Sequence, residues 1–152
     1  MTMSSLPVLD VVAGVLRDNE RVLLAQRAPG GSFAGCWEFP GGKVEEGETD
    51  QDALVRELHE ELGVRVQVEA LIKRVQHPYP SFSIDFRVYE CTLLEGEPSC
   101  VGVHDLRWAR MGGGVDESSS LRFPPADVPV LVALRRAAGL PEDPSFLASA
   151  PG

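Results

Sequence analysis

Alternating and apolar segments along the chain predict a series of β-strands. Residues 8–16 and 21–27 are mostly apolar or β-branched, and the polar residues 18–20 between them are typical of a turn, so a β-hairpin is expected here. Residues 37–40 form a short extended piece that runs into two glycines. Further strands are predicted at residues 64–76, 82–94 and 106–109.

The clearest helix is predicted at residues 50–62. Three leucines recur there at helical spacing, and acidic residues occupy the first turn. Thr49 or Asp50 can cap the N-terminus of this helix, and Gly63 is a typical stop.

A second amphipathic helix is predicted near the C-terminus. Residues 124–127 are typical of a helix start, and the apolar stripe that follows ends at Gly139. Residues 111–120 are rich in Gly and Ser and predict a loop. Without an internal repeat or a linker, residues 1–140 are expected to form a single domain and residues 141–152 a loose tail.

The net charge bears on the kind of ligand. The 152 residues carry a formal net charge of −9. Proteins that bind nucleic acid polymers normally present a basic stripe, so no polymer is expected as a partner. A small anionic ligand is compatible with this charge if metal ions shield the local carboxylates.

Cysteine usage and hydropathy indicate the compartment. Cys36, Cys91 and Cys100 are odd in number and lack metal-ligand spacing, so neither a disulfide framework nor a zinc site is expected. Residues 1–10 lack the features of a cleavable signal, and no later stretch is apolar for long enough to span a bilayer. A cytoplasmic location without a membrane partner is expected.

Three glutamates converge on the predicted helix. At helical spacing Glu57, Glu60 and Glu61 fall on one arc about 100° wide. Like charges repel, so the arc is either a solvated acidic face or a cation site. The adjacent Gly41 and Gly42 can bring backbone carbonyls close to it, and such hard oxygen ligands suit Mg²⁺ or Mn²⁺.

The complete residue spacing around these glutamates decides between a solvated acidic face and a cation site. A glycine is followed after five residues by a glutamate and after seven more by Arg-Glu-Leu, and the pattern closes with a Glu-Glu pair and Gly-Val, all within residues 42–64. This is the Nudix signature without a departure, and the chain resembles the Nudix family. The resemblance implies an α/β fold: an α/β/α sandwich with a mixed sheet and a loop-helix-loop catalytic motif. It also implies hydrolysis of a nucleoside diphosphate linked to a second group.

The resemblance also assigns roles within the box. Glu57 and Glu61 would be the principal metal ligands, Glu60 a further ligand and Gly42 a carbonyl ligand, with Mg²⁺ as the cofactor and Mn²⁺ as a substitute. Glu48 would be an additional ligand or would orient the base. Arg56 would orient the glutamates by ion pairing.

Similarity beyond the box, at residues 24–27, 37–43 and 123–130, is to the MutT-type branch, which includes enzymes acting on 8-oxo-dGTP and on CTP. The position matching Asp127 is an asparagine in the 8-oxo-dGTP enzyme, whereas relatives that prefer cytidine look more like the Pro-Ala-Asp present here. An ionised Asp127 accepts donors from either base, and it can also cap a helix. Lys43 is a candidate phosphate contact or an ordinary surface lysine, and Arg27 is a candidate phosphate contact or a member of a surface ion pair.

Two further site assignments stay open. Tyr79 and Phe82 lie in a Pro-containing loop and either stack on a base or pack in the core. Many MutT-like chains carry a glutamate where this sequence has Gly102, so His104 and Asp105 are either alternative catalytic bases or, as is more typical, surface loop residues. Glu48 or Glu60 in the box would serve if neither does.

The expected function is that of a Mg²⁺-dependent nucleoside triphosphate pyrophosphohydrolase that releases the monophosphate and pyrophosphate. Sanitation of 8-oxo-dGTP in the nucleotide pool is the leading hypothesis, and CTP, dCTP or a modified pyrimidine triphosphate is the alternative substrate. A non-catalytic Nudix module that senses nucleotides is a rival of another class, although the box glutamates are complete. The expected partner is a small-molecule nucleotide. The sequence leaves the oligomeric state open, with a monomer slightly favoured.

Overall fold

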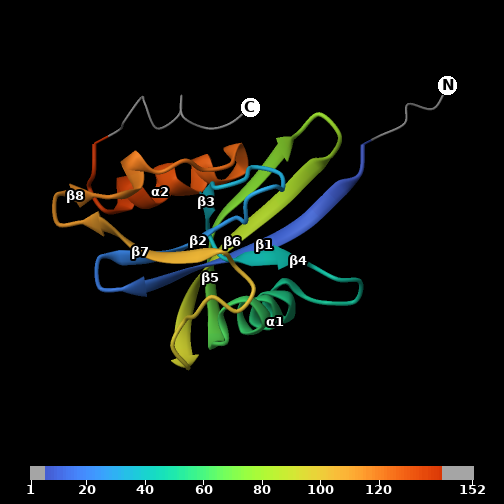
Figure 1. Cartoon of the computed structure of the whole chain (residues 1–152), viewed down its shortest axis with the longest axis horizontal. Helices are drawn as coiled ribbons and strands as arrows, with labels where there is room; N and C mark the ends of the chain where they lie inside the picture. The colour runs from blue at the N-terminus through green and yellow to red at the C-terminus, as the bar shows by residue number, and fades with distance from the viewer. Residues whose placement is uncertain (1–5, 142–152) are drawn as a thin grey trace.

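A mixed β-sheet lies between two α-helices in the computed structural model, which describes residues 6–141 (Figure 1). The described residues contain eight strands, which are β1 (Val8–Asp18), β2 (Arg21–Gln26), β3 (Trp37–Glu38), β4 (Gly41–Lys43), β5 (Arg65–Pro78), β6 (Ser83–Glu95), β7 (Asp105–Gly112) and β8 (Val115–Asp116). The helices are α1 (Asp50–Leu62) and α2 (Val128–Ala137), and 3₁₀ turns occur at Ser118–Ser120 and Pro125–Asp127. The predicted α/β class, with a loop-helix-loop between β4 and β5, is confirmed.

The strand order brings the first strand to the middle of the sheet. The order is β5-β6-β1-β2-β7-β8, with β3 beside β2 and β4 beside β1. β1 runs parallel to β6 from Val8 to Leu16, whereas its residues 11–13 pair antiparallel with β4 and its last two residues with β2. The two glycines at the start of the box are therefore fixed against the centre of the sheet.

Each helix buries an apolar stripe against its own face of the sheet. On α1, Leu54, Leu58 and Leu62 are completely buried, and they share a cluster with Val12 and Leu16 of β1. On the other face the stripe of α2 joins a cluster built from all the longer strands. The leucine spacing on which the first helix was predicted is thus the spacing that packs it.

Side-chain hydrogen bonds fix the start of α1. Thr49 caps the helix, because its Oγ1 accepts from the Asp52 N–H at 3.1 Å. The carboxylate of Asp50 accepts two bonds from Arg87 of β6, at 2.6 and 3.0 Å, and one from the Tyr89 hydroxyl at 2.5 Å. The Arg87 guanidinium holds the pKa of Asp50 below its ordinary value. The acidic helix is therefore tied to the sheet at its first turn.

The prediction of an irregular loop at residues 111–120 is wrong. This segment contains β8 and a 3₁₀ turn, because β7 and β8 form a hairpin around Gly113 and Gly114. Both glycines have positive φ, 60° and 80°, which glycine adopts without the usual steric cost. The Gly-rich composition was therefore typical of a tight hairpin turn as well as of a loop.

Two expectations concern the ends and the environment of the chain. The predicted tail at residues 141–152 lies outside the described residues apart from Pro141. Within residues 6–141, neither helix has the length and apolar character that crossing a bilayer would require.

Candidate active site

The guanidinium of Arg56 links three of the box glutamates. Its Nε and Nη2 donate to the two oxygens of Glu48 at 2.8 and 2.9 Å. Its Nη1 donates to Glu57 at 3.0 Å and to Glu60 at 3.2 Å. Nη2 also donates to the backbone oxygen of Lys43 at 3.0 Å. One arginine therefore ties the loop before α1, the end of β4 and the acidic face of α1 together.

Glu48 is held in its ionised form. The bidentate bond from Arg56 is the main cause, and with a further bond from the Glu45 N–H it lowers the pKa of Glu48 to about 2. A carboxylate with so low a pKa is a weak proton acceptor near neutral pH. This geometry fits a ligand or an orienting residue better than a general base.

Glu61 is in the opposite electrostatic situation. Burial, together with the neighbouring charges of Glu57 and Glu38, raises its pKa to about 8, although a hydrogen bond from the Gly41 N–H works in the other direction. This carboxyl therefore holds its proton near neutral pH unless a positive charge compensates it.

The two glycines of β4 allow the helix to approach the strand closely. A Cβ on Gly42 would overlap the carboxylate of Glu57, and a Cβ on Gly41 would overlap the backbone oxygen of Val12. Position 41 therefore requires glycine for steric reasons, whereas a side chain at position 42 would force the Glu57 carboxylate to move. The acidic face of α1 thus lies directly against the backbone of β4.

The donor set fits a divalent cation by its chemistry. Carboxylate oxygens with a nearby backbone carbonyl are the ligands that Mg²⁺ and Mn²⁺ prefer, and the raised pKa of Glu61 marks negative charge that a cation would compensate. Within residues 6–141, no three His, Cys, Asp or Glu side chains are arranged closely enough to hold a metal in the conformation observed. Arg56 binds three of the box glutamates instead.

A cavity of about 460 Å³ opens beside the box. Its wall includes Gly42 of β4 and Glu61 of α1, and also Arg27, Lys43 and Asp127, the residue that precedes α2. Residues from the box and residues far from it in the sequence therefore line one space. Its size is within the range of small-ligand sites.

Arg27 lies in the cavity wall and forms an ion pair, the alternative that the sequence left open, with Glu38 as its partner. Its Nη1 is 2.9 Å from Glu38, and its Nε donates to the backbone oxygen of Ser32 at 2.8 Å. Burial raises the pKa of Glu38, and the charge of Arg27 opposes this shift. The sequence did not single out Glu38, which belongs to the extended piece before Gly41 and to the segment 37–43 that resembles the MutT-type branch.

Asp127 is a buried residue of the cavity wall. Its side chain is buried, with 4% exposed, and its Oδ1 accepts from the Phe39 N–H at 3.4 Å. Burial raises its pKa well above the ordinary value, and the charge of Glu38 adds to the shift. The helix-capping alternative is wrong, since the side chain makes no capping hydrogen bond to α2.

Aromatic rings line the same region as Asp127. The ring of Tyr79 lies 5.0 Å from that of Phe82 and 5.3 Å from that of Phe33, measured between centroids, and all three line the cavity. The Tyr79 hydroxyl accepts from the Ala126 N–H at 3.2 Å. Tyr79 is buried and packs in the core, whereas Phe82 and Phe33 are only partly buried.

The candidate catalytic bases after β6 lie outside this cavity. The Gly102 N–H donates to the backbone oxygen of Glu61 at 2.9 Å, so this segment packs on the end of α1. His104 and Asp105 are exposed, and neither belongs to the residues that line the cavity.

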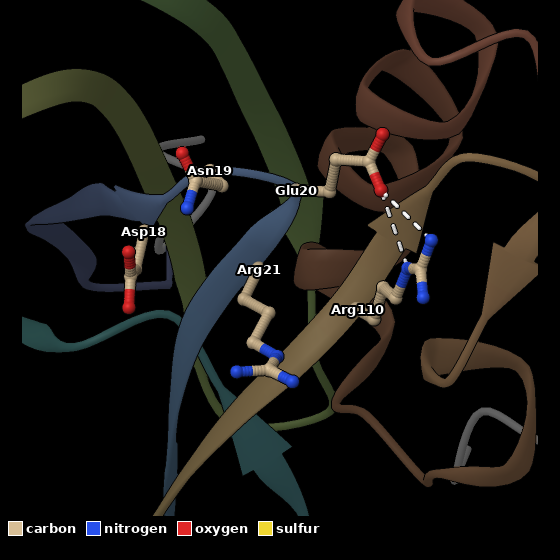
Figure 2. A pocket seen from close by; sticks show the side chains of 5 residues that line it. All are labelled: Asp18, Asn19, Glu20, Arg21 and Arg110. Atoms are coloured by element: carbon tan, nitrogen blue, oxygen red, sulfur yellow. Dashed lines mark hydrogen bonds and ion pairs between the residues drawn. The ribbon is translucent and has the colours of Figure 1, made fainter.

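A second hollow, of about 560 Å³, lies at the turn between β1 and β2 (Figure 2). Asp18, Asn19, Glu20, Arg21 and Arg110 line it. Arg110 is paired with Glu20 at 3.1 Å, and the lining mixes both signs of charge. None of the five belongs to the box, so the candidate active site is the cavity beside α1.

A sheet between two helices, with a glutamate-rich loop-helix-loop opening onto a cavity, defines a Nudix-type α/β hydrolase. The NUDIX domain model matches residues 11–133.

The 8-oxo-dGTP diphosphatase of Escherichia coli (strain K12) is 34% identical over 130 residues, which cover 84% of this chain and 97% of that protein. The CTP pyrophosphohydrolase of the same strain is 34% identical over 128 residues, covering 83% and 90%. The solution structure of the E. coli ORF135 protein superimposes with a TM-score of 0.73 at 32% identity, covering 94% of this chain and all of that one. The chain therefore belongs to the Nudix family of hydrolases, whose members generally use a divalent metal ion.

Proposed function

We propose that the protein is a Mg²⁺-dependent nucleoside triphosphate pyrophosphohydrolase, with Mn²⁺ as a substitute metal. The observation that carries this proposal is the continuity of one cavity from Gly42 and Glu61 of the box to Asp127 and the aromatic rings. One nucleotide can then occupy the cavity, with its phosphate chain beside Glu61 and its base beside the aromatic rings. The similarity to enzymes named for 8-oxo-dGTP and CTP supports a nucleoside triphosphate as the substrate.

In this proposal the box residues have the roles that the family resemblance implies. Glu57, Glu60 and Glu61, with the carbonyl of Gly42, hold the metal, which supplies charge neutralisation for the phosphates and a lowered pKa for the attacking water. Arg56 orients Glu57 and Glu60 through the bonds described above. Release of Arg56 from Glu57 and Glu60 would free their oxygens for the metal.

Two cations are proposed to contact the phosphate chain. Lys43 is exposed, lines the cavity and directly follows Gly42 in β4. Arg27 lies deeper and has Glu38 as a counter-ion, so phosphate binding there competes with an existing ion pair. We therefore assign the stronger phosphate contact to Lys43.

At the other end, Asp127 is proposed to recognise the base, with Phe82 forming part of the wall. The raised pKa of Asp127 means that its carboxyl can donate a hydrogen bond as well as accept one. The leading substrate is 8-oxo-dGTP, which would make the protein a sanitiser of the nucleotide pool. CTP, dCTP or a modified pyrimidine triphosphate is the second candidate, favoured by the similarity to the CTP pyrophosphohydrolase.

The same proposal includes the setting of the enzyme. It acts in the cytoplasm as a single domain formed by residues 1–140, on a small nucleotide and not on a nucleic acid polymer. The net charge of −9 supports the last point, because a polymer would be repelled over most of the surface.

A panel of nucleotides with Mg²⁺ tests the class and the substrate together. Pyrophosphate and orthophosphate are measured separately for 8-oxo-dGTP, dGTP, CTP and dCTP, with Glu57→Gln as the inactive control. We expect the highest kcat/KM with 8-oxo-dGTP and a loss of at least about a hundredfold in the variant. Turnover that survives in Glu57→Gln at saturating Mg²⁺ would refute the metal assignment.

A further inference from the structure

Phe33 has a backbone conformation that bulky residues rarely adopt. Its φ is +54°, in the left-handed region, and the only other described residue apart from glycine with positive φ is Asn19 in the β1–β2 turn. Such positions persist only where the surroundings fix them, and they concentrate at ligand sites. The loop between β2 and β3 thus holds Phe33 in an energetically unfavourable backbone conformation.

Backbone hydrogen bonds hold Phe33 in this conformation. The Arg27 N–H donates to the backbone oxygen of Cys36 at 2.9 Å, and the Gly35 N–H donates back to that of Arg27 at 3.3 Å. The Cys36 N–H donates to the oxygen of Phe33 itself at 3.0 Å. The Nε of Arg27 fastens the far side of the loop through Ser32. Both ends of the loop are therefore closed on each other.

The effect of this closure is to direct an aromatic ring into the cavity. Ser32 and Ala34 on either side are exposed, whereas Phe33 is partly buried and lines the cavity. Its ring packs against Tyr79 at a tilt of 52° and contacts the apolar cluster beneath α2. Because the ring is only partly covered, part of it stays available to a ligand.

We propose that Phe33 is a specificity-determining residue for the base. Its ring forms a stacking wall at the aromatic end of the cavity, in the region where Asp127 lies. A bicyclic purine covers more of this ring than a pyrimidine does, so Phe33 favours purine triphosphates. This inference rests on the proposed function, because it assumes that a nucleotide base occupies this end of the cavity.

Two variants without the ring and one with it test the proposal. Phe33→Leu keeps apolar volume, and Phe33→Asn introduces the residue type that tolerates positive φ best apart from glycine. Phe33→Tyr keeps the ring. Gly31→Ala is a control in the same loop, because an added Cβ there meets no atom within 4 Å. The measured quantities are kcat/KM for dGTP and for CTP and the thermal midpoint of each variant.

We expect the Leu and Asn variants to lose roughly tenfold in kcat/KM for dGTP, mainly through KM, and clearly less for CTP. Phe33→Tyr and Gly31→Ala should keep the wild-type ratio. An unchanged ratio of dGTP to CTP in the folded ring-less variants would overturn the role of Phe33. Failure of the wild-type protein to hydrolyse any nucleoside triphosphate would instead overturn the proposed function, and with it the assumption on which this inference rests.

Discussion

Replacing Glu61 by Gln is expected to stabilise the metal-free protein while removing its activity. The folded protein holds the proton of Glu61 up to a pH of about 8, whereas the unfolded chain releases it near the ordinary value of 4.5. The raised pKa of Glu61 contributes its full stability below pH 4.5, where the carboxyl is protonated in both states. As the pH rises from 4.5 to 8 the unfolded chain releases the proton first, so this contribution is progressively lost. Gln cannot ionise, so the variant escapes this loss.

The magnitude follows from the same pKa. Neutral pH lies about 2.5 units above the ordinary pKa, and each unit corresponds to about 1.4 kcal/mol, so the variant should gain up to about 3 kcal/mol at pH 7. For a chain of this length, 1 kcal/mol moves the thermal midpoint by about 2 to 4 °C. The expected gain is therefore up to about 6 to 12 °C at pH 7.

Thermal unfolding in a metal chelator between pH 4 and pH 9 measures this gain. The difference between Glu61→Gln and the wild type should vanish below pH 4.5 and widen as the pH rises to 8. Glu60→Gln is the matched control, because the side chain of Glu60 is 57% exposed and its replacement should change the midpoint little. Added Mg²⁺ should stabilise the wild type more than Glu61→Gln. Equal midpoints for the wild type and Glu61→Gln across this pH range would refute the reasoning.

Three other outcomes are expected. Gly42→Ala should lower turnover at least about a hundredfold, because the added Cβ displaces the Glu57 carboxylate. Gly31→Ala is the control and should keep the wild-type rate, and equal rates for Gly42→Ala and the wild type at saturating Mg²⁺ would count against this prediction. Asp127→Ala should change the ratio of kcat/KM between 8-oxo-dGTP and CTP by about five- to 150-fold, the equivalent of about 1 to 3 kcal/mol, and a lower midpoint with an unchanged ratio would show a structural role only. The apparent affinity for Mg²⁺ should rise as the pH rises toward 8, because a proton competes with the metal at Glu61; isothermal titration at several pH values would show no such trend if this is wrong.

Local signals in the sequence were sufficient to predict the elements that carry the box. Helix α1 begins and ends as predicted, since the leucine period, the Thr49 cap and the Gly63 stop all act within one segment. The hairpin of β1 and β2 follows for the same reason. The small strand β8 was missed, because its pairing depends on a two-glycine turn whose composition also suits a loop.

The residues at the other end of the cavity depend on contacts between distant segments, which no local pattern contains. Asp127 accepts its hydrogen bond from Phe39, 88 positions away in the chain, and Glu38 belongs to the cavity only because β3 pairs with the edge of β2. Phe33 stands alone in a small-residue loop, so it has no periodicity to mark it. Its role becomes visible only through its backbone angle and its contact with Tyr79.

The most direct test of the central claim is the phosphorus balance of the reaction with 8-oxo-dGTP in the presence of Mg²⁺. The account predicts one monophosphate and one pyrophosphate for each triphosphate consumed, no reaction in a metal chelator, and a loss of at least about a hundredfold in Glu57→Gln. Stepwise release of orthophosphate, or turnover that survives without metal, would contradict it.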